Sequence, residues 1–124
     1  MEQSGAEGYL EERVELSLLY DFYGALLKEN QRRMFEANVL EDYSLTEIAE
    51  EEGISRQGVY DAVKRASGQL KKYEERLGLV KRFQRQNTLV RILKERLTEF
   101  DGIQQEEGWQ EIRLLLEELL EEEF

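Results

Sequence analysis

The sequence has no cysteine, no histidine and no proline among its 124 residues. Without cysteine there is no disulfide and no thiolate metal site. Without histidine as well, the commonest general base, the commonest metal ligand and the thiol nucleophile are all missing. The carboxylates stand in helical runs such as "EEE", and "GISRQG" lacks the GK[ST] ending of a phosphate-binding loop. We therefore expect a non-enzymatic protein with no catalytic residue, no metal site and no cofactor.

Long apolar runs are missing too. No stretch approaches the roughly 20 apolar residues that a membrane-spanning helix needs. The first residues, "MEQSGAEGYLEERVEL", are acidic and contain no apolar signal core. We therefore expect no membrane span and a cytoplasmic location.

The absence of proline, together with abundant Leu, Glu, Lys and Arg, favours an all-α chain. Apolar residues at steps of three and four predict helices over residues 11–27, 31–41, 55–77, 80–100 and 105–122, with a short helix "TEIAEEE" before the third. Gly78 offers a stop, and Asp101 with Gly102 marks a turn. The chain is thus predicted to form a head domain of four helices, residues 1–78, and a two-helix C-terminal hairpin, residues 79–124.

The same periodicity predicts which side chains face the interior of these helices. In the first helix they are Val14, Leu18, Leu19, Phe22, Leu26 and Leu27, and Asn30 is expected to cap the second helix. In the final pair they are Phe83, Leu89, Val90, Leu93 and Leu97 on one helix and Trp109, Ile112, Leu116, Leu119 and Leu120 on the other.

The stretch "YSLTEIAEEEGISRQGVYDAVKRA", residues 43–66, has the steric pattern of a helix-turn-helix. Ala49 is small where the two helices would cross. Gly53 supplies the positive φ that ends the first helix. Ile54 is expected to fill the space beneath the turn. Ser55 is expected to cap the second helix, and Val59 to begin its buried stripe.

Three blocks, "LYDFYGALL", "NQRRMFEANVLEDYSLTEIAEEEGISRQGVYDAVKRA" and "YEERLGL", together resemble the YlxM family of small bacterial helix-turn-helix proteins. The head is also similar to region 4 of sigma factors. The resemblance implies an accessory role in the signal recognition particle pathway, with contact to the particle RNA or to its protein subunit. One departure is Gly58, inside the second helix of the motif, where alanine would be about 1 kcal/mol better.

The formal net charge of -11 conceals a strong segregation, because residues 55–96 carry +8 and the remainder carries -19. Screening limits charge effects to a Debye length of about 8–10 Å, so a locally basic segment can bind phosphate in an acidic protein. Arginine and glutamine suit base edges in a major groove, and tyrosine suits stacking on an unpaired base. The candidate nucleic-acid-binding residues are Arg56, Gln57, Tyr60, Lys64, Arg65, Lys71, Lys72, Lys81, Arg82 and Arg85.

Four carboxylates, Glu47, Glu50, Glu51 and Glu52, occupy the helix that crosses the DNA backbone in DNA-bound heads. They oppose docking on duplex DNA and favour RNA, which a basic surface binds through shape, backbone and splayed bases. The alternatives are a sequence-specific DNA-binding regulator and a protein-binding adaptor without nucleic acid.

The C-terminal segment reverses the charge of the helix before it. Residues 103–124 carry a net charge of -7. Antiparallel pairing would lay these acidic residues beside basic ones. Three roles for the hairpin stay open: a staple of the fold, an arm of a homodimer, or an acidic screen over the basic surface.

Overall fold

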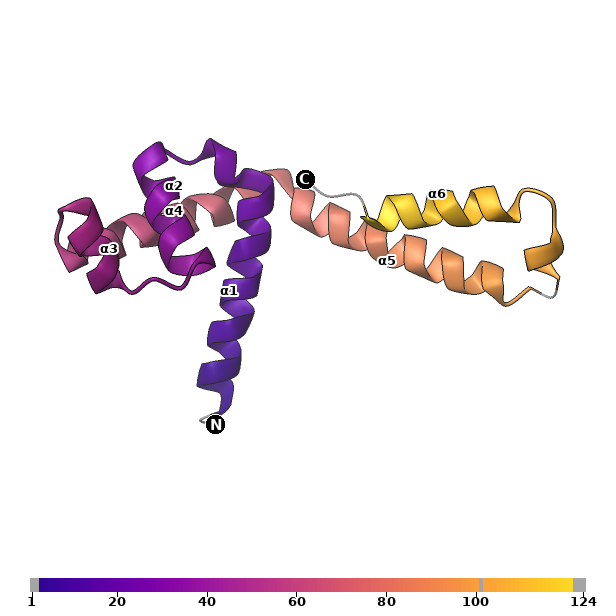
Figure 1. Ribbon diagram of the computed structural model, residues 1–124, viewed down its shortest axis with the longest axis horizontal. Coiled ribbons are helices and arrows are strands. Elements are labelled where there is room, and N and C mark those ends of the chain that lie inside the picture. Colours follow the sequence, from indigo (N-terminus) through magenta and orange to yellow (C-terminus); the bar gives the residue numbers. More distant parts are fainter. Residues whose placement is uncertain (1–2, 101, 122–124) are drawn as a thin grey trace. The chain divides into compact units, whose positions relative to one another are not determined.

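The computed structural model describes residues 3–100 and 102–121, and this part of the chain forms six α-helices joined by turns (Figure 1). The predicted all-α fold is confirmed. None of the helices in the described ranges is both long and apolar enough to cross a membrane. The chain divides into two compact units, Met1–Gly78 and Leu79–Phe124.

The first unit is built around one long helix. Its helices are α1 (Gln3–Tyr23), α2 (Glu29–Phe35), α3 (Leu45–Glu52) and α4 (Arg56–Leu77). A 3₁₀ turn, Gly24–Leu26, follows α1, and a π-helical turn, Glu36–Leu40, follows α2. This long helix is α4, which packs against α1, α2 and α3 and is the central helix of the unit. One face of α4 is therefore covered and the opposite face is left to solvent.

The core follows from the spacing of apolar residues on α4. Val59, Ala62, Ala66 and Leu70 recur at steps of three and four, and all four are buried. Val59 and Ala62 pack in one cluster with Met34, Ile48 and Ala49 from α2 and α3. The small side chains of Ala49 and Ala62 let α3 and α4 cross closely.

The first helix differs from the prediction in both its start and its buried face. It begins eight residues earlier than residue 11, at Gln3. Val14 is 69% exposed and Leu26 is 57% exposed, whereas the buried side chains include Leu16, Leu19 and Tyr23. The stripe 16–19–23 also obeys helical spacing, so periodicity alone does not choose between the two faces in a helix this rich in apolar residues.

The cap of the second helix was also predicted wrongly. α2 begins at Glu29 with Lys28 in the cap position, and the Asn30 side chain accepts a hydrogen bond from the Gln31 N–H at 2.9 Å. Asn30 therefore lies inside the first turn of α2 and not before it.

The second unit is an antiparallel helical hairpin (Figure 1). α5 (Leu79–Thr98) leads through a 3₁₀ turn, Ile103–Gln105, to α6 (Trp109–Glu121). Trp109 and Leu116 are buried, and Lys94 Nζ lies 3.6 Å from Glu117 Oε1 across the hairpin. The predicted proximity of acidic and basic side chains is therefore present between α5 and α6.

The hairpin corrects two further predictions. α6 begins four residues later than residue 105, because Gly108 has a φ of 89° and interrupts the helical path. Asp101 of the expected turn and the expected helix end at residue 122 lie outside the described residues, while Gly102 has a φ of 74°. Four predicted inward side chains are 39–53% exposed: Leu89, Leu93, Ile112 and Leu119.

Candidate nucleic-acid interface

The turn between α3 and α4 is fixed by caps at the helix ends. Ser44 Oγ accepts a hydrogen bond from the Glu47 N–H, and the Glu47 carboxylate accepts one from the Ser44 N–H, each at 3.0 Å. Gly53 ends α3 with a φ of 69°. Ser55 Oγ then accepts from the Gly58 N–H at 2.9 Å and starts α4. These contacts set the direction in which α4 leaves the turn and hence which of its faces is exposed.

Ile54 does not fill the space beneath the turn. Its side chain is 44% exposed, whereas Ala49 and Val59 are 8% and 0% exposed and occupy the helix crossing. A β-carbon placed on Gly58 would lie 3.5 Å from Ile54 Cδ1. Ile54 therefore lies over Gly58 on the outside of the turn.

The ten predicted nucleic-acid-binding residues fall in two different units. The second-unit members, Lys81, Arg82 and Arg85, are exposed on α5. The first-unit members are exposed on α4: Arg56, Gln57, Tyr60, Lys64, Arg65, Lys71 and Lys72. The seven residues on α4 lie in one unit, and they therefore form the candidate surface.

A basic face surrounds Gly68 on α4. At about 100° per residue, Gly68 lies opposite Val59 and thus opposite the buried stripe. The four residues that flank Gly68 one turn away are all exposed cations, namely Lys64, Arg65, Lys71 and Lys72. Apart from its sequence neighbours and the backbone of its own helix, no heavy atom lies within 4 Å of a β-carbon built on Gly68. This surface, called the Gly68 face below, combines four positive charges with an open stretch of helix backbone.

The first turns of α4 make contacts among themselves. Gln57 Nε2 donates a hydrogen bond to Asp61 Oδ1 at 3.0 Å. A glutamine that reads adenine in a major groove must donate through that same nitrogen. Lys64 Nζ lies 5.9 Å from the centre of the Tyr60 ring, within range of a cation–π contact. Because Nε2 of Gln57 carries two N–H groups, Gln57 can keep its hydrogen bond to Asp61 and still donate to a base.

Lys71 has a partner that the sequence analysis missed. Its Nζ lies 3.3 Å from Glu12 Oε1 on α1, and both side chains are about half exposed. Exposed pairs of this kind contribute about 0–1 kcal/mol, so a phosphate can compete for the lysine. Because 59 residues separate Glu12 from Lys71, no local pattern in the sequence signals this contact.

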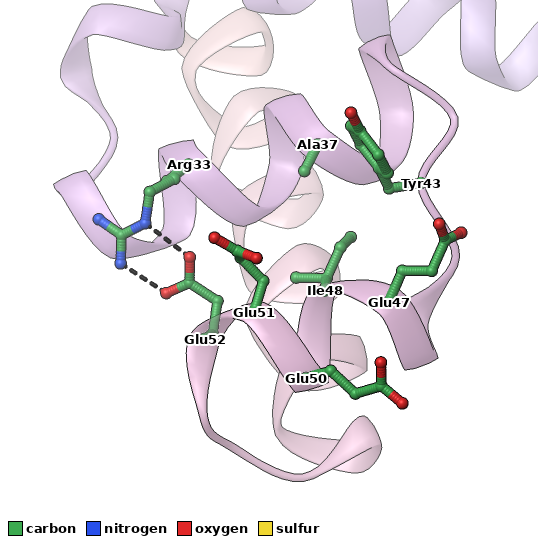
Figure 2. Close-up of a pocket in the computed structure, with 8 residues that line it drawn as sticks. All are labelled: Arg33, Ala37, Tyr43, Glu47, Ile48, Glu50, Glu51 and Glu52. Atoms are coloured by element: carbon green, nitrogen blue, oxygen red, sulfur yellow. Dashed lines mark hydrogen bonds and ion pairs between the residues drawn. The ribbon is translucent and has the colours of Figure 1, made fainter.

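The face of α3 forms an acidic groove beside α2 (Figure 2). The groove has a volume of about 660 Å³. Its lining residues are Arg33, Ala37, Tyr43, Glu47, Ile48, Glu50, Glu51 and Glu52. Arg33 was not among the predicted site residues, yet its Nε and Nη2 donate to the two carboxylate oxygens of Glu52 at 2.8 and 2.7 Å. One of the four carboxylates is therefore paired within the unit.

The groove repels anions at neutral pH. Hydrogen bonds from Arg33 hold the pKa of Glu52 below its usual value. The backbone N–H of Ser44 likewise lowers the pKa of Glu47. Glu50 and Glu51 line the same groove and are exposed. A cation or a basic side chain fits these surroundings, whereas a phosphate is disfavoured.

The matches to known proteins agree on one family. A family model described as "Putative helix-turn-helix protein, YlxM / p13 like" (UPF0122) matches residues 10–109. A UPF0122 protein of Thermoanaerobacter sp. is 50% identical over 108 residues, covering 86% of this chain and 89% of that protein. One from Caldanaerobacter subterraneus is 58% identical over 80 residues, covering 64% and 68%. One from Halalkalibacterium halodurans is 38% identical over 110 residues, covering 89% and 95%.

Proposed function

Since the chain belongs to the UPF0122 family of YlxM / p13-like helix-turn-helix proteins, we propose that it is a non-enzymatic accessory protein of the signal recognition particle pathway. In this proposal it acts in the cytoplasm and binds the particle RNA through the Gly68 face. The protein subunit of the particle is the alternative partner that the family resemblance implies.

The observation that carries the proposal is the charge of the Gly68 face. Lys64, Arg65 and Lys72 are exposed on it, and the carboxylate that pairs with Lys71 is itself exposed. Lysine and arginine in such a row neutralise successive phosphates of a nucleic-acid backbone and release their counterions. Gly68 adds no side chain between them, so a backbone can approach α4 closely. The Gly68 face thus suits recognition of a backbone more than recognition of base edges.

The acidic groove on α3 favours RNA over duplex DNA as the ligand. In DNA-bound helix-turn-helix proteins, the first helix of the motif crosses the DNA backbone. Here that helix carries Glu47, Glu50 and Glu51, which line the groove without a positive neighbour other than Arg33 among its lining residues. Double-stranded RNA does not need that docking geometry, because proteins contact its shallow minor groove and its phosphates.

The test is a set of titrations with signal recognition particle RNA, random RNA of the same length and duplex DNA. Each ligand is titrated at about 50 and 200 mM salt, a range over which phosphate contacts dominate the change in affinity. The variant Lys64→Gln/Lys72→Gln should weaken RNA binding and reduce the salt slope by roughly one for each phosphate that is no longer neutralised. The control is Lys28→Gln, which removes one positive charge at an exposed lysine before α2, where the double variant removes two.

The three candidate functions give different results. Preference for particle RNA over random RNA and DNA, abolished in the double variant but kept in the control, supports the proposal. Saturable duplex binding that prefers one sequence, and that Arg56→Gln relaxes, would favour a DNA-binding regulator. No binding to any nucleic acid, together with retention of the particle's protein subunit, would favour a protein-binding adaptor.

A further inference from the structure

The hairpin formed by α5 and α6 exposes an apolar surface that its own helices do not cover. Five side chains that are 39–53% exposed make up this surface, called the outer face below: Leu89, Leu93, Ile112, Leu115 and Leu119. Single exposed leucines are normal on a protein surface, but a contiguous apolar patch marks an interaction site. These five side chains mark such a site only if they form one patch.

The positions of the leucines in the sequence show on which side of each helix they lie. Leu89 and Leu93 stand one residue before and three residues after Val90. Leu115 and Leu119 stand one residue before and three residues after Leu116. At about 100° per residue, both pairs are turned away from their reference residue by the same 60–100° and in the same sense.

Both reference residues face the inside of the hairpin. Leu116 is buried, and Val90 lies one turn before Lys94, which pairs with Glu117 across the hairpin. Because α5 and α6 are antiparallel (Figure 1), the same rotation from the inside carries both leucine pairs to the same side. The outer face is therefore one apolar layer that spans both helices.

The charges of the two helices indicate what covers this layer. α5 carries six basic residues against one acidic residue, and α6 carries four acidic residues against one basic residue. A second hairpin that also has one basic and one acidic helix would be attracted to this surface if its basic helix lay over α6 and its acidic helix lay over α5. The chain itself supplies such a hairpin, and an axis parallel to the helices places α5 of one copy against α6 of the other.

We propose that a second copy of the chain covers the outer face, so that two hairpins form a four-helix bundle. Packing of two apolar layers in this way is the ordinary arrangement of helix bundles. In this dimer Leu93 of one copy packs near Leu115 of the other. The opposite arrangement, with α5 on α5, brings the two basic helices together and is disfavoured.

The test measures the mass of the full-length chain by sedimentation velocity and by light scattering. The wild-type protein should have twice the chain mass of 14.7 kDa. Leu93→Glu and Leu115→Lys should each be monomeric, because each places a charge in the apolar layer against a helix of its own sign. Mixing these two variants should restore a dimer, since glutamate then meets lysine across the interface.

The matched control is Leu114→Lys, next to Leu115 and 58% exposed. It is turned about 100° further from the outer face and should leave the dimer intact. Circular dichroism of each variant separates a disrupted interface from a disrupted fold, and the restored heterodimer excludes misfolding. A monomeric wild-type chain overturns the proposal, as does a dimer that persists in both Leu93→Glu and Leu115→Lys. Dimers that fail to return on mixing overturn the pairing of α5 with α6.

Discussion

The two interior glycines of α4 are expected to respond differently to the same substitution. Gly68 and Gly58 lie on the same helix, and the same change, glycine to alanine, is made at each. Beyond the adjacent helix backbone, a β-carbon at Gly68 has no heavy atom within 4 Å, whereas one at Gly58 lies 3.2 Å from Ser55 Oγ. Alanine is about 1 kcal/mol better than glycine inside a helix when nothing else changes. The full gain is therefore expected at Gly68 only, and the gain that helix propensity alone predicts at Gly58 is not expected, because Ser55 Oγ is too close.

The expected shift in melting temperature follows from the size of the first unit. A gain of about 1 kcal/mol raises the melting temperature of a domain of 60–100 residues by roughly 4–8 °C. Gly68→Ala should show a shift of this size. Gly58→Ala should show little or none, because its β-carbon crowds the hydroxyl that caps α4. Thermal unfolding followed by far-UV circular dichroism measures both shifts. Equal shifts for the two variants would mean that the Ser55 hydroxyl does not crowd a methyl group at residue 58.

Gly68→Ala also separates stability from binding. The variant keeps all four charges of the Gly68 face, so electrostatic attraction to RNA is unchanged. If an RNA backbone approaches the open stretch of α4, the new methyl group should weaken binding although the protein becomes more stable. Gly58→Ala serves as the control in the same titration. Unchanged RNA affinity in Gly68→Ala would mean that the ligand does not touch α4 at this point.

Three further changes probe the contacts of the first unit. Ser44→Ala removes the acceptor that caps α3 and should cost about 1 kcal/mol in urea unfolding. Because Arg33 lowers the pKa of Glu52, the stabilising charge is present above the ordinary value of 4.5 and is lost as pH falls through the lower folded value. Glu52→Gln should therefore be less stable than wild type at neutral pH, and the difference in melting temperature should shrink in acid. Glu12→Gln releases Lys71 and should raise RNA affinity at low salt.

Local signals explain why the helix-turn-helix could be derived from the sequence. Gly53 and Ser55 act through their own backbone or through a residue three positions away, and Val59 begins a stripe with helical spacing. Interactions between residues so close in the sequence can be recognised from the residue types and their spacing. Ile54 was misplaced because its exposure depends on how Ala49 and Val59 fill the crossing, which spacing does not reveal.

Contacts between distant segments could not be derived in this way. The pairs Arg33–Glu52 and Glu12–Lys71 join helices that are far apart in the sequence. Charged residues are so common in this chain that each had many equally plausible partners. Leu93 was predicted to face inward because it lies on the apolar face of an amphipathic helix. Amphipathic spacing shows which face is apolar, but it does not show whether that face packs against the same chain or against another molecule.

The salt dependence of binding connects the Gly68 face with the proposed dimer. A phosphate must displace Glu12 to reach Lys71, so the other three of the four cations give about three phosphate contacts per head without that exchange. At about 0.7–0.9 per contact, one head then gives a slope of roughly -2 to -3 in a plot of log affinity against log salt. Two heads engaged on the same RNA would double that slope. The net charge of -11 repels RNA at long range. Salt screens distant charges more than close ones, so the local contacts decide the affinity for RNA at physiological ionic strength.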